Sequence, residues 1–271
     1  MKPYRPLTLY EANQLATRIA EFYHRLQNWK IPTPAFFDIK VEDDGAIVEY
    51  ATDVGEDCYA VLRREPARFD ELVSGMIIGS LPLLKIDQRD VGFDSHPANW
   101  CVDASSTLTY VDFKPPRLCY DGVHLVGFPQ PEDPEDVRIG TWRYYSREGI
   151  LRRLVFTCER LGPGKGQQTI LKTLRTADAE CAQWATAYLD TLPAAIVRKN
   201  PSLFHAIVKA LSPDEVDDLR DLAVVCVECF GAPPDLLEQV LSLSHTSYRK
   251  PRADRHAGFE KARSLLLNQR S

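Results

Sequence analysis

The sequence predicts an α+β fold in which a small lobe with a short antiparallel sheet precedes a mostly helical lobe. A helix pattern and a hairpin pattern open the chain, a second pair of short strands lies near residues 100–111, and helical spacing dominates beyond residue 142. Strands gathered early and helices gathered late are typical of this class. We expect the small lobe to cover residues 1–57 and the helical lobe to cover residues 58–271.

The first predicted element is a helix that begins at Thr8. Thr8 and Glu11 have the spacing of a capping box, in which each side chain bonds to the backbone of the other residue. Apolar residues then recur at helical spacing: Ala12, Leu15, Ala16, Ile19, Phe22 and Leu26. Pro32 and Pro34 prevent the helix from continuing, because proline lacks the N–H that the next turn needs.

A hairpin follows the helix. The apolar segments 36–41 and 46–50 flank an acidic turn at residues 42–45, in which Gly45 can adopt a positive φ. Residues 52–57 are polar, which predicts a connector to the second lobe.

The second lobe is predicted to be mostly helical. A helix is expected over residues 64–86, with a break or kink at Gly79 and Pro82. Short strands are expected at 100–102 and 108–111. The clearest later helices cover residues 147–161, 168–192, 203–211 and 213–230.

Composition bounds the class of protein. The chain has 271 residues, 44% of them apolar, and a formal net charge of −5. An acidic chain is a poor match for nucleic acid, which needs a basic surface. No apolar run approaches the length of a membrane span, no secretory signal opens the sequence, and the cysteines are odd in number, so we expect a reduced cytoplasmic protein. Residues 249–271 are basic, which fits either a solvated terminal helix or a docking segment for an acidic partner.

The residues that point to chemistry lie between positions 92 and 113. The first string reads Gly92-Phe93-Asp94-Ser95-His96-Pro97-Ala98-Asn99, and the second reads Tyr110-Val111-Asp112-Phe113. This pattern resembles the catalytic loop and metal motif of the aminoglycoside phosphotransferase and choline kinase superfamily. The resemblance implies a kinase-like fold with two lobes, and it covers residues 39–117.

The resemblance also implies roles for single residues. Asp94 would accept the proton of the hydroxyl that receives a phosphoryl group, and Asn99 and Asp112 would supply oxygen ligands to Mg²⁺ beside ATP. His96 would brace the loop. An acceptor that is a small molecule or a peptide would complete the reaction.

The chain departs from the family in front of its first helix. The Gly-rich loop and the strand lysine that normally hold ATP are not recognisable in the sequence. Lysine stands where the metal motif usually has glycine. Lys114 and Arg117 could supply the missing positive charge, or they could face solvent or pair with acidic neighbours. We expect Lys114→Ala to leave nucleotide affinity unchanged if this residue has no such role.

Two functions therefore remain open. The first is a phosphotransferase that depends on ATP and Mg²⁺, in which the acidic segment 132–136 would attract a cationic substrate. The second is a kinase-like protein without transfer activity, which would bind a peptide, a nucleotide or a partner enzyme in a bacterial natural-product or peptide-maturation pathway. A partner protein that completes the nucleotide site lies between the two.

Two further signals are weak. Residues 162–169 contain Gly and Lys but lack the spacing of a phosphate loop, and no strand precedes them, so we expect a turn between helices. Cys226 and Cys229 form a single CxxC in an apolar helix, which favours core packing over zinc.

Overall fold

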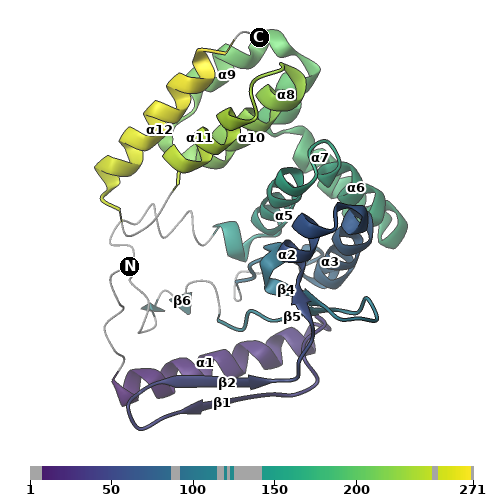
Figure 1. Ribbon diagram of the computed structural model, residues 1–271, viewed down its shortest axis with the longest axis vertical. Helices are drawn as coiled ribbons and strands as arrows, with labels where there is room; N and C mark the ends of the chain where they lie inside the picture. Colours follow the sequence, from purple (N-terminus) through teal and green to yellow (C-terminus); the bar gives the residue numbers. More distant parts are fainter. Residues whose placement is uncertain are drawn as a thin grey trace.

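The computed structural model describes residues 8–86, 92–114, 142–245 and 250–269, and the backbone alone of residues 119–120 and 123–124. Figure 1 shows three groups of elements: an N-terminal helix with a hairpin, a central group of helices beside short strands, and a C-terminal group of helices. The described chain is mostly helical and its strands pair antiparallel, which confirms the predicted α+β class.

The first helix, α1 (Leu9–Asn28), begins as predicted. The Glu11 backbone N–H donates to Thr8 Oγ1 at 3.2 Å, and the Thr8 backbone N–H donates to Glu11 Oε2 at 2.8 Å. All six apolar positions predicted to face the core are buried. The helix is therefore fixed by its cap at one end and by one apolar face along its length.

The predicted hairpin is also present. Strands β1 (Phe37–Val41) and β2 (Ile47–Ala51) pair antiparallel, with Ile39 opposite Glu49. Gly45 has φ +84° in the turn, a region that glycine enters without steric cost.

A three-stranded sheet lies between the hairpin and the central helices. Its order is β3 (Glu56–Asp57), β4 (Trp100–Val102) and β5 (Leu108–Tyr110). Strand β3 was not predicted, since two polar residues carry no strand pattern. Strand β6 (Cys119–Tyr120) pairs antiparallel with β7 (Val123–His124).

The central helices surround the first hydrophobic core. They are α2 (Cys58–Arg64), α3 (Phe69–Leu84), α5 (Arg147–Leu161), α6 (Gly166–Ala177) and α7 (Ala179–Asp190), with the 3₁₀ turns η1 (Pro66–Arg68) and η2 (Pro97–Asn99).

Of the break or kink predicted at Gly79 and Pro82, the break is wrong, because α3 continues through both residues to Leu84. Pro82 removes only the N–H that would donate to the Ile78 carbonyl, and α3 ends two residues later. Gly79 is needed for packing, since a Cβ there would lie 2.5 Å from the Trp100 ring.

The single helix predicted over residues 168–192 is also wrong. Asp178 has an extended backbone between α6 and α7, and its side chain accepts a hydrogen bond from the Cys181 N–H at 2.8 Å. Asp178 therefore acts as an N-cap that starts a new helix. The apolar periodicity alone did not show that one helix ends and another begins at Asp178.

The C-terminal helices form a second core, made largely of side chains from residues 194–266. They are α8 (Pro193–Lys199), α9 (Phe204–Ala210), α10 (Val216–Cys229), α11 (Asp235–Leu243) and α12 (Arg252–Leu267), with η3 (Pro201–Leu203) and η4 (Pro213–Glu215). The basic terminal helix α12 buries Phe259, Ala262 and Leu266 in this core, so one of its faces is structural.

The first core continues from α1 to α7, across the boundary predicted at residues 57 and 58. That boundary between lobes remains a prediction. None of the helices within the described ranges is long and apolar enough to cross a membrane.

Candidate functional site

The loop that carries Asp94 is folded by its own polar side chains. Asp94 Oδ1 accepts a hydrogen bond from the His96 N–H at 3.1 Å, and His96 Nδ1 accepts one from the Ala98 N–H at 3.1 Å. The turn η2 then leads through Asn99 directly into β4. His96 thus contacts the loop backbone, and burial together with the nearby Arg153 guanidinium lowers its pKa.

Asn99 and Asp112 are brought together by the hairpin of β4 and β5. The Val111 N–H donates to the Asn99 carbonyl at 2.9 Å, so Asp112 follows the strand end beside Asn99. Asn99 Nδ2 donates to the Asp94 carbonyl at 3.1 Å, which joins this strand end to the loop. All three predicted residues therefore meet at one place.

The Asp112 carboxyl is half-buried and short of positive charge. Burial, and then the charge of the nearby Asp94 carboxylate, raise its pKa to about 6. Its partners are the Lys114 N–H, at 3.2 Å from Oδ1, and the Lys114 charge. A second carboxylate close to a desolvated one is an arrangement that a cation would relieve.

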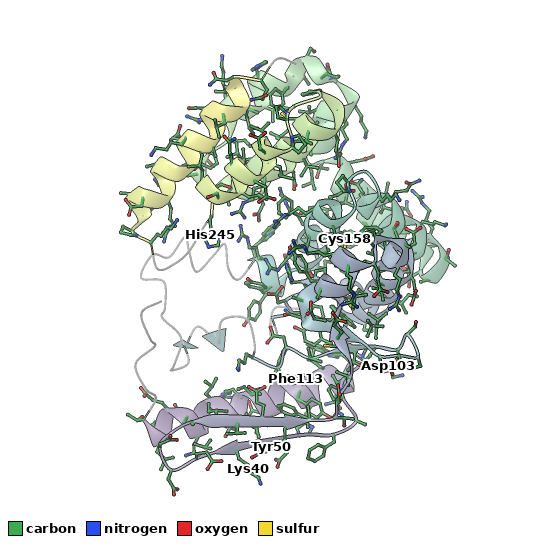
Figure 2. The ribbon with its side chains drawn as sticks, in the orientation of Figure 1. Lys40, Tyr50, Asp103, Phe113, Cys158 and His245 are labelled. Carbon is green, nitrogen blue, oxygen red and sulfur yellow. The ribbon has the colours of Figure 1, made fainter. Side chains whose placement is uncertain are left out.

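Phe113 fixes Asp112 at the junction with the N-terminal elements. Its ring makes edge contacts with Tyr23 at 5.2 Å and Phe37 at 4.6 Å between centroids. Figure 2 shows Phe113 beside the hairpin of β1 and β2. Lys114 is exposed, and its Nζ pairs with Glu49 Oε1 of β2 at 3.2 Å. Arg117 and the segment 132–136 lie outside the described residues.

Asn99 and Asp112 fit a magnesium ion that is also held by nucleotide phosphates. Mg²⁺ commonly takes one or two protein oxygens in such sites. Because Asn99 Nδ2 is engaged by the Asp94 carbonyl, its Oδ1 is the atom left for a ligand. Within the described ranges, no three His, Cys, Asp or Glu side chains are grouped to hold a metal by themselves.

Helix α5 approaches the other side of Asp94. The Arg153 guanidinium donates to both Asp94 oxygens, with Nη2 at 3.0 Å from Oδ2. Two further bonds hold the loop against this part of the chain: the Phe93 N–H to the Tyr144 carbonyl at 2.8 Å, and Ser95 Oγ to the Ile150 carbonyl at 2.9 Å.

A cleft of about 310 Å³ opens beside this ion pair, between α5, α10 and the helical residues 142–145. We call it the arginine cleft, after the five arginines in its lining: Arg143, Arg152, Arg153, Arg160 and Arg220. His96 and His245 also line it, and Asp217 is the one acidic residue that the described parts of the chain contribute to the lining.

The sequence analysis missed these arginines. On α5, the cleft residues Arg153, Thr157 and Arg160 are separated by four and three positions, the spacing of one helix face. That spacing could have predicted a polar face on this helix, but nothing in the sequence indicated that this face lies against Asp94.

The two weak signals are structural where the structure describes them. Glu159 accepts hydrogen bonds from the Gly164 N–H at 2.8 Å and the Gln167 N–H at 2.7 Å, so the turn before α6 is capped by the chain's own carboxylate. Cys226 is buried in the second core and Cys229 is exposed.

No family model, no curated protein and no solved structure matches this chain.

Proposed function

We propose that this chain is a kinase-like phosphotransferase that moves the γ-phosphoryl group of ATP to a hydroxyl group of a small molecule. The observation that carries the proposal is the meeting of Asp94, Asn99 and Asp112 at one junction, in the order and spacing of the motif. Capped turns are common in proteins, but a turn alone does not require the carboxylates of Asp94 and Asp112 to lie close together in a partly buried environment.

The chemistry assigned to the chain's own residues is limited. The acceptor oxygen forms a bond to the γ-phosphorus while the bond from phosphorus to the β–γ bridging oxygen breaks, and ADP leaves. Asp94 would accept the hydroxyl proton; a carboxylate has about four acceptor positions, and described donors occupy three of them. Mg²⁺ held by Asn99 and Asp112 would neutralise charge on the phosphates.

Binding of Mg-ATP is the first test. A ligand that binds only the native state stabilises it by about 2.7 kcal/mol at a hundred times its Kd, so Mg-ATP should raise the Tm. Asp112→Asn should remove this shift, and Asp94→Asn should keep it. Asp43→Asn is a matched control, since Asp43 is exposed in the hairpin turn. An unchanged Tm of the wild-type protein with millimolar Mg-ATP would contradict the proposal.

Turnover is the second test. Transfer of labelled γ-phosphate to hydroxyl compounds should fall by at least about a hundredfold in Asp94→Asn, the usual contribution of general-base catalysis. Equal transfer by the wild type and Asp94→Asn would remove Asp94 from the mechanism.

One observation favours a second candidate, a kinase-like binding protein without transfer activity. The Arg153 guanidinium donates hydrogen bonds to both Asp94 oxygens and so occupies acceptor positions that a substrate hydroxyl would need. The described N-terminal elements also include no Gly-rich loop that could cover phosphates. A binding protein of this kind would show a Tm shift with Mg-ATP but would form no labelled product. Labelled product that forms only when a partner chain is added would mean that the partner completes the nucleotide site.

A further inference from the structure

We propose that the arginine cleft binds the acceptor substrate, and that this acceptor carries an anionic group, either a carboxylate or a phosphate ester, besides the hydroxyl that receives the phosphoryl group. This inference rests on the proposed function. It replaces the cationic acceptor expected from residues 132–136 with one of opposite charge.

The position of the cleft separates it from the nucleotide side of the site. The charged groups that most shift the pKa of Asp112 are Asp94, Lys114 and Glu49. Arg153 of α5 pairs with Asp94 and lines the cleft, whereas Asn99 and Asp112 do not line it. Figure 2 shows Phe113 beside the hairpin and His245, at the cleft, near the C-terminal helices. An acceptor in the cleft would thus approach Asp94 beside Arg153.

The charge of the cleft favours an anion. Four carboxylates pair with four of the five guanidinium groups: Asp94 with Arg153, Asp217 with Arg143 and Arg220, and Asp218 and Asp221 with Arg152. Burial raises the pKa of Asp221 to about 7, so near neutral pH this carboxyl is partly protonated. The group therefore keeps at least one net positive charge.

Donor groups are also left over. Arg160 is exposed in the lining, and no hydrogen bond or ion pair joins it to another residue of the described ranges. Arg143 Nε and Arg152 Nε are buried N–H groups without an acceptor in the same ranges. Arg160 is therefore the accessible donor for the oxygens of an anion, and the two buried N–H groups add to the excess of donors around the cleft.

His245 reports the positive potential of the cleft. Burial, and then the charges of Arg220 and Lys250, lower the pKa of its imidazole. The lowered pKa of His245 is consistent with a net positive charge in the arginine cleft. The size also fits, because a cleft of about 310 Å³ suits a small metabolite rather than a folded partner.

Binding of simple anions tests the cleft directly. Inorganic phosphate and malate are titrated by calorimetry into the wild type, Arg160→Gln and Arg175→Gln. Arg175 is the control, because it is an exposed arginine on α6 that lies outside the cleft. We expect Arg160→Gln to weaken binding of the preferred anion by about tenfold, as the loss of one charge-assisted hydrogen bond predicts, and Arg175→Gln to leave it unchanged. Phosphate and malate distinguish a phosphate ester from a carboxylate.

Transfer assays then test the assignment as acceptor site. With Mg-ATP, glycerate or glycerol 3-phosphate should be phosphorylated and glycerol and ethanolamine should not, with kcat/KM lowered by Arg160→Gln through KM. Phosphorylation of ethanolamine or glycerol in preference to both anions would overturn the inference. Competition between Mg-ATP and the simple anion would also overturn it, since the cleft would then hold the nucleotide. Anion binding that depends on Arg160, without any Tm shift from Mg-ATP, would overturn the phosphotransferase and leave an anion-binding site.

Discussion

Replacing Asp112 by asparagine should stabilise the metal-free protein at neutral pH, because burial makes this carboxylate costly to ionise. The pKa of the Asp112 carboxyl rises from its ordinary value of 3.8 to about 6 in the folded chain. One pKa unit corresponds to about 1.4 kcal/mol. Ionised Asp112 therefore lowers the free energy of unfolding by about 3 kcal/mol above pH 6.

The direction of the pH dependence follows from proton uptake. Between pH 3.8 and about 6 the folded chain holds this proton more tightly than the unfolded chain, so stability falls as the pH rises through that window. Asparagine has no such transition, and its Oδ1 can still accept the Lys114 N–H. The two proteins should be equally stable below pH 3.8 and differ most above pH 6.

Thermal unfolding in chelator, followed across this pH range, measures the effect. A chain of about 150–250 residues gains about 2–4 °C in Tm for each kcal/mol, so Asp112→Asn should unfold several degrees higher than the wild type at neutral pH. Mg-ATP should reverse this order, since only the wild type offers the carboxylate. The reasoning is refuted if the variant is less stable without metal, or if the difference does not change with pH.

Three further predictions concern how the site is held. Arg152→Met should cost about 3–5 kcal/mol in urea unfolding, because it leaves the buried carboxyls of Asp218 and Asp221 without their partner; a value near zero would mean that the two are neutral in the folded chain. Gly55→Ala should destabilise the connector by at least about 1 kcal/mol, since Gly55 has φ +93° and a Cβ would lie 2.1 Å from the Val102 carbonyl oxygen; Gly164→Ala, also at positive φ but with open space around it, is the control. Gly79→Ala should cost about 1–3 kcal/mol through overpacking against Trp100, and an unchanged Tm would show that the ring moves freely.

Local signals in the sequence predicted the elements that depend on neighbouring residues. The capping box of Thr8, the turn at Gly45 and the ends of α5 rest on contacts within a few positions. The junction of Asn99 with Asp112 was also within reach, because one short hairpin joins them.

The features that were missed depend on distant pairs. Arg153 lies 59 positions from Asp94, and Arg152 lies 66 from Asp218. Arginines are common on helices, so their types and spacing do not reveal which carboxylate they meet. The restart at Asp178 was missed for a related reason, since its cap interrupts a periodic pattern that is the same on both sides.

Charged side chains, rather than apolar ones, join the two hydrophobic cores, and this arrangement calls for an explanation. Helices α5 and α10 come from different cores, and they meet through Arg152 and the carboxylates of Asp218 and Asp221. Buried ion pairs of this kind contribute little net stability, and apolar residues of similar volume often serve equally well. Stability alone thus does not explain five arginines at one interface beside a carboxylate that belongs to a catalytic pattern. The proposed anionic acceptor would give them a role, because the same guanidinium groups that join the cores would then orient it toward Asp94.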